Sequence, residues 1–365
     1  MSDDTRHMRH AIALGSRGVG RTGRVPSVGC VIVSPDGRIA GRGRTDESGR
    51  PHAEAVALAQ AGNAARGATA YVTLEPCSHQ GASGGPCADA LIAAGVARVV
   101  IACGDPDPRV NGQGIAKLKA AKIAVTTGVL AEEATEALAG FFLRIAEERP
   151  LVTLKIAQSL DGKTATVSGD SKWITGEAAR RFGHLMRAQN DAILVGVNTA
   201  LADDPELTCR IAGLEGHSPL RVVLDTRLRL NEWSRLATTA AQTPTLVFTT
   251  AAEGGGKLIA AGVEIVRVAP DARGRPDIGA MLTQLSKRNV TQLLVEGGAT
   301  VHAAFLDRGL ADRLEIFTAP MTLGAAGHSA IDALAALTLD EAPKFTRVET
   351  RRLGADLLES FVRKA

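Results

Sequence analysis

The sequence has few cysteines and few aromatic residues, and it lacks long apolar segments. Its 365 residues include five cysteines, one tyrosine and two tryptophans. A sparse, odd set of cysteines in a chain this long argues against a disulfide framework and favours reduced thiols or metal ligation. No apolar run approaches the roughly 20 residues of a membrane-spanning helix, and the polar residues 1–10 do not resemble a signal peptide. We therefore expect the protein in the cytoplasm.

Blocks of like charge are also missing. The formal net charge is +3 at pH 7, and no Lys/Arg cluster with interleaved aromatic residues occurs. Nothing therefore indicates binding to nucleic acid, although a small anionic ligand is compatible with this balance. Hydrophobic residues make up 45% and charged residues 22%, and these proportions are typical of a soluble globular protein.

The length and the hydrophobic pattern predict two α/β domains, since a domain has about 100 to 200 residues. From residue 4 onward, short β-branched strands alternate with alanine-rich helices, and the pattern restarts near Pro150. We place the two domains at residues 1–147 and 148–365. The predicted strands are 28–33, 70–74, 96–102, 151–156, 192–195, 221–224, 245–248, 292–295 and 314–317, and the second domain has helices at 177–189 and 278–287.

The first domain contains a set of zinc ligands in three short segments, namely His52, Cys77 and Cys87. One imidazole and two thiolates form a tetrahedral site whose fourth position is open to water, and zinc lowers the pKa of that water to about 7. Glu54 is placed to take a proton from the water and to deliver it to leaving ammonia. This combination is typical of zinc-dependent deaminases that act on amino-heterocycles.

A proline precedes each of these ligands, so we expect the ligands at helix N-termini, where thiolate is favoured. The alternative is that His52 caps a helix and that both cysteines are ordinary buried thiols. Each residue alone fits that alternative, but their combination with Glu54 favours the metal site. His79, in the loop between the cysteines, could contact substrate or could make only local hydrogen bonds.

A glycine turn in the second domain predicts a nucleotide site. Gly297 and Gly298 follow the strand that ends at Val295, and a helix begins after them. Backbone amides at such a turn suit a phosphate, although a tight turn without a ligand is an equal alternative. Residues 18–23 also match G-x-G-x-x-G, but they follow a helix rather than a strand, so we expect a loop there.

Together these motifs closely resemble the bifunctional riboflavin-biosynthesis deaminase–reductase family. The resemblance rests on residues 51–54, 73–79, 159–162, 173–175, 202–205 and 296–298, and it covers nearly the whole chain. It implies a three-layer cytidine-deaminase-like domain followed by a dihydrofolate-reductase-like α/β domain. The implied reactions are zinc-dependent deamination of 2,5-diamino-6-(5-phosphoribosylamino)pyrimidin-4(3H)-one and NADPH-dependent reduction of the ribosyl side chain to ribityl. We also expect a homo-oligomer, with a dimer favoured.

The resemblance further implies roles for particular residues. Zinc would be held by His52, Cys77 and Cys87, with Glu54 shuttling protons. The NADPH site would be lined by Ala157, Trp173, Thr199, Asp203, Thr226, Gly298, Ala299, Thr300, Val301, His302, Ala303 and Ala304. The reductase substrate would contact Ser171, Arg187, Leu207, Arg210 and Glu296.

Two further expectations concern charged residues of the second domain. Arg187 and Arg210 can grip a phosphate bidentately. Lys155 and Asp203 are candidates for polarising the opened sugar, and a buried or interdomain ion pair is the open alternative.

Three segments depart from the family pattern. Val25-Pro26 stands in place of an Asn-Pro pair, Asp107 replaces an asparagine, and residues 80–86 lack a basic side chain. These changes leave the metal ligands and Glu54 unchanged but alter expected contacts to the deaminase substrate. Two alternatives follow: an active reductase fused to a deaminase domain with another substrate, or a structural zinc module fused to a nucleotide-binding domain.

Overall fold

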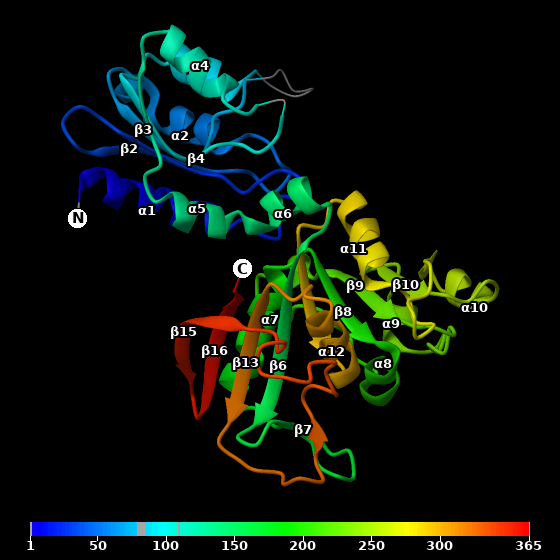
Figure 1. The fold of residues 1–365 in the computed structure, drawn as a ribbon. Coiled ribbons are helices and arrows are strands. Elements are labelled where there is room, and N and C mark those ends of the chain that lie inside the picture. Colours follow the sequence, from blue (N-terminus) through cyan, green and yellow to red (C-terminus); the bar gives the residue numbers. More distant parts are fainter. Residues whose placement is uncertain (1, 79–84, 109, 365) are drawn as a thin grey trace. The chain divides into compact units, whose positions relative to one another are not determined.

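The computed structural model divides the chain into two compact units, Met1–Arg149 and Pro150–Ala365 (Figure 1). It describes residues 2–78, 85–108 and 110–364, and His79 lies outside this set. Within these ranges no helix is both long and apolar enough to cross a membrane.

The first unit is a five-stranded sheet between two layers of helices, which confirms the predicted three-layer α/β class. Its strands are β1 (Gly29–Val33), β2 (Ile39–Arg44), β3 (Thr69–Leu74), β4 (Arg98–Cys103) and β5 (Ala124–Thr127), in the spatial order β2-β1-β3-β4-β5. Its helices are α1 (Asp3–Ser16), α2 (Ala53–Ala61), α3 (Cys87–Ala93), α4 (Gln113–Ala120), α5 (Ala131–Ala137) and α6 (Ala139–Glu147), with a short 3-10 turn at Gly62–Ala65.

Alternate residues of the strands supply two cores, because successive side chains point to opposite faces of a sheet. Cys30 and Ile32 pack with α2, α3 and α4, whereas Val31 and Val33 pack with α1 and α5. Figure 1 shows α2 and α4 on one side of the sheet and α1 and α5 on the other. Two helices, α5 and α6, follow β5 and meet at Leu138.

Strand β2 was not predicted. Its glycines explain why the sequence pattern does not reveal the strand and how helix α2 packs against it. A Cβ atom at Gly41 would lie 2.1 Å from the carbonyl oxygen of Ala57, and one at Gly43 would lie 2.1 Å from that of Ala53. Helix α2 therefore packs directly on the strand backbone. Glycine lowers strand propensity, so this tertiary requirement conceals the strand from pattern analysis.

The second unit contains a nine-stranded sheet of order β11-β10-β9-β8-β12-β6-β13-β16-β15, parallel up to β13 and antiparallel beyond it. The strands are β6 (Leu151–Ser159), β8 (Ala192–Gly196), β9 (Leu220–Leu224), β10 (Thr245–Thr249), β11 (Glu264–Arg267), β12 (Gln292–Gly297), β13 (Arg313–Ala319), β15 (Phe345–Leu353) and β16 (Asp356–Arg363). A separate pair is formed by β7 (Lys163–Ala165) and β14 (His328–Ser329).

Helices cover both faces of this sheet. They are α7 (Glu177–Ala188), α8 (Val197–Asp203), α9 (Arg235–Thr238), α10 (Gly256–Ala260), α11 (Ile278–Lys287) and α12 (Ala299–Asp307), with a 3-10 turn at Glu215–His217. Buried residues of α11 and α12 share one core, and those of α7, α9 and α10 share the other.

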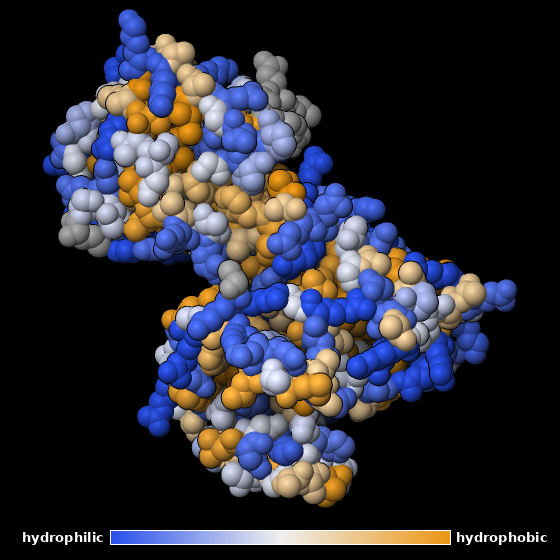
Figure 2. Space-filling view, viewed as in Figure 1, coloured by the Kyte–Doolittle hydropathy of each residue, from blue (hydrophilic) through white to orange (hydrophobic). Residues whose placement is uncertain are grey.

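The six strands predicted for this unit are confirmed, whereas β11, β15, β16 and the short strands β7 and β14 were missed. Strand β15 is exposed along nearly its whole length, so it has no apolar alternation to detect. Figure 2 shows a largely hydrophilic surface over this strand.

Candidate functional site

Two helices and one strand end bring the expected zinc ligands together. His52 is the N-cap residue of α2, and Cys87 is the first residue of α3. The expectation that every ligand opens a helix is wrong for Cys77, which lies in the irregular segment that follows β3. The His52 side chain makes no capping hydrogen bond, so the helix-cap alternative does not explain this residue.

The three donor atoms have the spacing of a tetrahedral metal site. Nδ1 of His52 lies 3.3 Å from Sγ of Cys87 and 3.6 Å from Sγ of Cys77. All three atoms lie within 4.8 Å of one another. Zinc bonds of about 2.0 Å to nitrogen and about 2.3 Å to sulfur place tetrahedral neighbours roughly 3.6 Å apart. The residues therefore fit a zinc ion.

The electrostatic surroundings of the two cysteines differ. A hydrogen bond from the Cys87 thiol, opposed by burial and supported by a hydrogen bond from His52, lowers the pKa of Cys77 to about 4. The backbone N–H of Cys87 also donates to Sγ of Cys77 over 3.3 Å. Contact with Cys77 raises the pKa of Cys87 in turn. Cys77 is thus a thiolate at neutral pH, and thiolate is the form that binds zinc.

Glu54 lies beside the three ligands in the first turn of α2 and is 3% exposed. Burial raises the pKa of its carboxyl group, while its own backbone N–H and the Cys87 thiol act in the opposite direction. A carboxyl group whose pKa is raised by burial is easier to protonate, so it can both accept and return a proton. The arrangement therefore supplies a metal site with an adjacent proton carrier.

Two acidic residues near Cys77 received no role from the sequence. Glu75 is 3% exposed and accepts backbone hydrogen bonds from the start of α4. Burial, together with the charges of Asp107, Glu75 and Cys77, raises the pKa of Asp105 to about 6. Glu75 lies within the family motif at residues 73–79, and Asp105 lies two residues before Asp107, but motif spacing cannot show which side chains are buried.

The second unit has a buried ion-pair cluster. Nε and Nη2 of Arg187 donate to the two carboxylate oxygens of Glu296 over 2.7 and 2.8 Å, and Nζ of Lys155 lies 4.0 Å from Glu296. Burial raises the pKa of Glu296, but the charges of Arg187 and Lys155 outweigh that effect and lower the pKa to about 2. The cluster joins α7, β12 and β6.

The expected nucleotide turn is also assembled. A Cβ atom at Gly297 would lie 3.1 Å from Cγ2 of Thr199, and Gly298 has a φ of +96° and precedes α12. Thr199, from α8, thus lies directly against the glycine turn. Within the expected range 298–304, however, His302 and Ala303 are buried, and Nδ1 of His302 is bonded to the carbonyl oxygen of Ala330 over 3.0 Å.

The remaining expected residues are more dispersed. Trp173 is 65% exposed and stacks on the Arg180 guanidinium. Asp203 lies 3.7 Å from Lys172 rather than pairing with Lys155. The carbonyl oxygen of Thr226 accepts a hydrogen bond from Thr249.

Apart from Arg187 and Glu296, the expected substrate contacts lie in two segments. Leu207 is buried with a φ of +55°, and Arg210 pairs with Glu206 over 3.1 Å. Ser171 accepts a backbone hydrogen bond from Ile174. Ala157, which was expected to line the NADPH site, lies on β6, two residues after Lys155.

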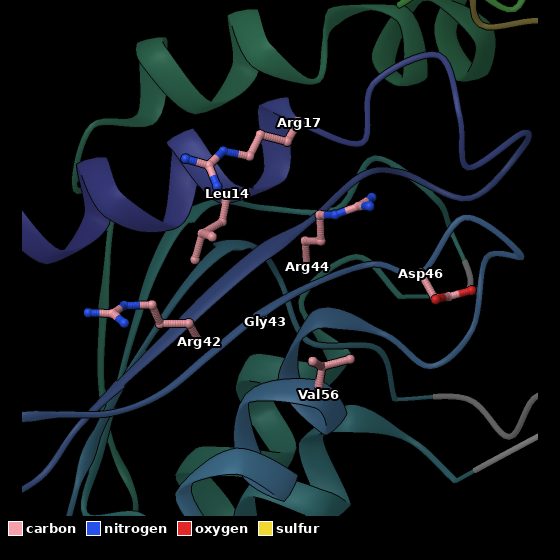
Figure 3. A pocket seen from close by; sticks show the side chains of 7 residues that line it. All are labelled: Leu14, Arg17, Arg42, Gly43, Arg44, Asp46 and Val56. Carbon is pink, nitrogen blue, oxygen red and sulfur yellow. The ribbon is translucent and has the colours of Figure 1, made fainter. Parts of the chain in front are cut away.

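A cavity of about 350 Å³ in the first unit is lined by Leu14, Arg17, Arg42, Gly43, Arg44, Asp46 and Val56. In Figure 3 the three guanidinium groups extend in different directions instead of converging on one point. Arg44 is also paired with Glu47 over 3.0 Å. We therefore assign this cavity no part in the metal site.

Two family models match the chain in sequence order. Residues 1–103 match the cytidine and deoxycytidylate deaminase zinc-binding region, and residues 150–358 match the RibD C-terminal domain. The chain is similar to the riboflavin biosynthesis protein RibD of Aquifex aeolicus, with 41% identity over 99% of this chain and 98% of that protein. It is 40% identical to the Escherichia coli RibD over 97% of this chain and 98% of that protein.

Solved structures agree with these matches. Acinetobacter baumannii RibD is 37% identical, with a TM-score of 0.88 over 100% of this chain and 99% of that chain. A diaminohydroxyphosphoribosylaminopyrimidine deaminase/5-amino-6-(5-phosphoribosylamino)uracil reductase from Thermotoga maritima is 35% identical, with a TM-score of 0.87 over 99% of each chain. Because both units match relatives over nearly their full lengths, the chain belongs to the RibD family of riboflavin biosynthesis proteins.

Proposed function

We propose that the chain catalyses two consecutive steps of riboflavin biosynthesis. The first unit deaminates 2,5-diamino-6-(5-phosphoribosylamino)pyrimidin-4(3H)-one, and the second reduces the ribosyl side chain with NADPH to give 5-amino-6-(5-phosphoribitylamino)uracil. The observation that carries this proposal is the group of His52, Cys77 and Cys87 beside Glu54 in a chain whose other unit matches the RibD reductase domain. The full-length matches favour it over a retuned deaminase or a structural zinc module.

Each residue of the deaminase site has a proposed task. Zinc, when bound, supplies a Lewis acid that makes water nucleophilic at neutral pH. Cys77 and Cys87 provide the anionic ligands, and His52 provides Nδ1. Glu54 takes the proton of the water that attacks the pyrimidine C2 and returns it to the departing ammonia. Its burial favours this exchange by excluding bulk water.

In the reductase unit we propose that Lys155 donates a proton to the imine nitrogen that forms at C1′ when the ribosylamine ring opens. Burial lowers the pKa of Lys155, and the charge of Glu296 opposes that shift. The ammonium is thereby more acidic than an exposed lysine and can release a proton as hydride arrives from NADPH. Thr199 and Gly298 are proposed to contact the cofactor phosphate at the turn that precedes α12.

The two arginines are proposed to have different tasks. Arg187 already uses Nε and Nη2 on Glu296 and Nη1 on the carbonyl oxygen of Thr208, so it orients these groups. Arg210 has a side chain that is 54% exposed, and its partner Glu206 can be exchanged for a substrate phosphate. We therefore assign the phosphate contact to Arg210.

Mass analysis of the products made with and without NADPH tests both halves together. We expect the deaminated ribosyl compound without NADPH and the ribityl compound with it. Removal of zinc should stop ammonia release. Ammonia release that persists without zinc would contradict the metal site, and the absence of NADPH oxidation on the deaminated compound would contradict the reductase assignment.

We also propose a cytoplasmic homo-oligomer, a dimer in the first instance. The five cysteines are all free thiols, which supports a reducing compartment. Analytical ultracentrifugation of the purified chain would show the stoichiometry, and a monomer at micromolar concentration would contradict the proposed dimer.

A further inference from the structure

Glu75 is a buried carboxylate two residues before Cys77, and it makes an unusual number of backbone contacts. Its Oε2 accepts the N–H of Gly112 over 2.9 Å, and its Oε1 accepts those of Gly114 and Ile115 over 2.9 and 3.2 Å. These N–H groups lie at the start of α4, where a helix has unpaired donors and a positive dipole end. The carboxylate thus binds α4 to the segment that follows β3.

The backbone of residues 75–77, the segment that follows β3, contacts a neighbouring element at each residue. The N–H of Glu75 donates to the carbonyl oxygen of Cys103 over 3.0 Å, which extends the pairing of β3 with β4. The carbonyl oxygen of Pro76 faces Gly114 so closely that a Cβ atom there would lie 2.0 Å from it. The carbonyl oxygen of Cys77 accepts the N–H of Ala88 over 3.2 Å, at the start of α3.

Helices α3 and α4 are themselves joined by an ion pair. Nζ of Lys117, in α4, lies 2.6 Å from Oδ1 of Asp89, in α3. Cys87 is the first residue of α3, so this pair connects the helix that Glu75 caps with the helix that bears the other thiol ligand. The two sulfur atoms therefore depend on the same small frame of α3, α4 and the segment after β3.

We infer that Glu75 is a positioning residue of the deaminase site, which holds Cys77 in ligating position through the first turn of α4. This inference rests on the proposed zinc site. A glutamine cannot replace Glu75 fully, because its amide nitrogen donates rather than accepts and would face a backbone N–H. An alanine leaves the N–H groups of Gly112, Gly114 and Ile115 without their acceptor, of which that of Gly114 is buried, and releases Pro76 from its contact with α4.

The zinc affinity of the full chain tests this inference. Residues that support metal ligands typically change the affinity by about 10- to 100-fold when they are replaced. We expect Glu75→Ala to weaken zinc binding by about this factor in competition with a chromophoric chelator, and Glu75→Gln to weaken it less. Cobalt(II) bound in place of zinc should show an altered visible absorption spectrum in Glu75→Ala.

A second variant reaches the same contact from the other side. In Gly114→Ala the new Cβ would press on the carbonyl oxygen of Pro76 while the Glu75 carboxylate remains. It should also weaken zinc binding, and it keeps the test available if Glu75→Ala does not fold. Asp277→Ala is the matched control, because Asp277 caps α11 in the second unit by accepting the N–H of Ala280 over 2.8 Å.

The outcomes separate the possible roles of Glu75. Lower thermal stability of Glu75→Ala with wild-type zinc affinity and a wild-type cobalt spectrum would reduce Glu75 to a helix cap and overturn the inference. A wild-type chain that binds no zinc would instead refute the proposed metal site. Weaker binding in both Glu75→Ala and Gly114→Ala, with Asp277→Ala unchanged, supports the positioning role.

Discussion

At the residue scale, charge and burial give Cys77 and Glu54 of the first unit different acid–base properties. The thiolate of Cys77 is stabilised by hydrogen bonds from its neighbours, whereas burial makes the Glu54 carboxylate easier to protonate. The first property suits a permanent metal ligand, and the second suits a group that gains and loses a proton. Chemically distinct roles therefore arise within one small volume.

Replacing Glu54 separates metal binding from catalysis. We expect Glu54→Gln to retain stoichiometric zinc and to lose deamination by at least about 100-fold, because the amide has no exchangeable proton of suitable pKa. Reduction of the deaminated compound should be unchanged. Metal analysis and the two separate assays measure this, and substantial ammonia release by Glu54→Gln would remove Glu54 from the mechanism.

The Glu296 cluster predicts a pH-dependent loss of stability in the second unit. The pKa of Glu296 is about 2 when folded and about 4.3 when unfolded. Because the pKa is lower in the folded state, ionised Glu296 stabilises the fold at pH values above its unfolded pKa. This stabilisation is lost progressively as the pH falls through the folded pKa. Between about pH 7 and pH 3 the loss should be on the order of 2 kcal/mol.

Urea unfolding at both pH values, followed by circular dichroism, measures this change. Glu296→Gln should be less stable than wild type at neutral pH because Arg187 loses its partner. It should also lose less further stability on acidification, since no carboxylate titrates at that position. Equal acid sensitivity of the two proteins would show that this pair does not control the response.

At the element scale, helix α2 depends on the glycines of β2. Gly43→Ala would place a Cβ atom 2.1 Å from the carbonyl oxygen of Ala53, so α2 must shift and carry His52 with it. We expect a stability loss of about 1 to 3 kcal/mol and weaker zinc binding.

Thermal unfolding and chelator competition measure these two effects. The matched control is Gly104→Ala in the same unit, where an added Cβ atom meets nothing within 4 Å. A Gly43→Ala protein with wild-type stability and zinc affinity would contradict the tight packing of α2 on β2.

The structural elements differ in how well the sequence predicted them. Strands with an apolar face, such as β8 and β12, were predicted because burial leaves a local pattern. Strand β2 has its glycines in place of that pattern, and β15 is charged and exposed. These two strands are stabilised by pairing with their neighbours in the chain, β1 and β16, rather than by an apolar pattern of their own, and a local window on either strand cannot register that pairing.

At the scale of the whole molecule, the two units carry separate chemistry on one chain. We expect a chelator to abolish ammonia release while NADPH oxidation on supplied 5-amino-6-(5-phosphoribosylamino)uracil continues at its original rate. Among the described residues, the side chains that could hold a metal ion together are His52, Cys77 and Cys87, and all three lie in the first unit. The described part of the reductase unit therefore offers zinc no such set of ligands. Parallel inhibition of both activities by the chelator would show that the units depend on one another.

The sequence alone determined the two-part α/β organisation and predicted a set of zinc ligands with an adjacent proton carrier, because these depend on residue type and spacing. Only the tertiary structure decided that Cys77 lies after a strand, that Arg187 is already occupied by Glu296, and that Glu75 caps α4 beside Cys77. Such features depend on which backbone and side-chain groups meet after segments far apart in the chain have packed. Burial then sets their charges and their partners, and neither can be derived from local spacing.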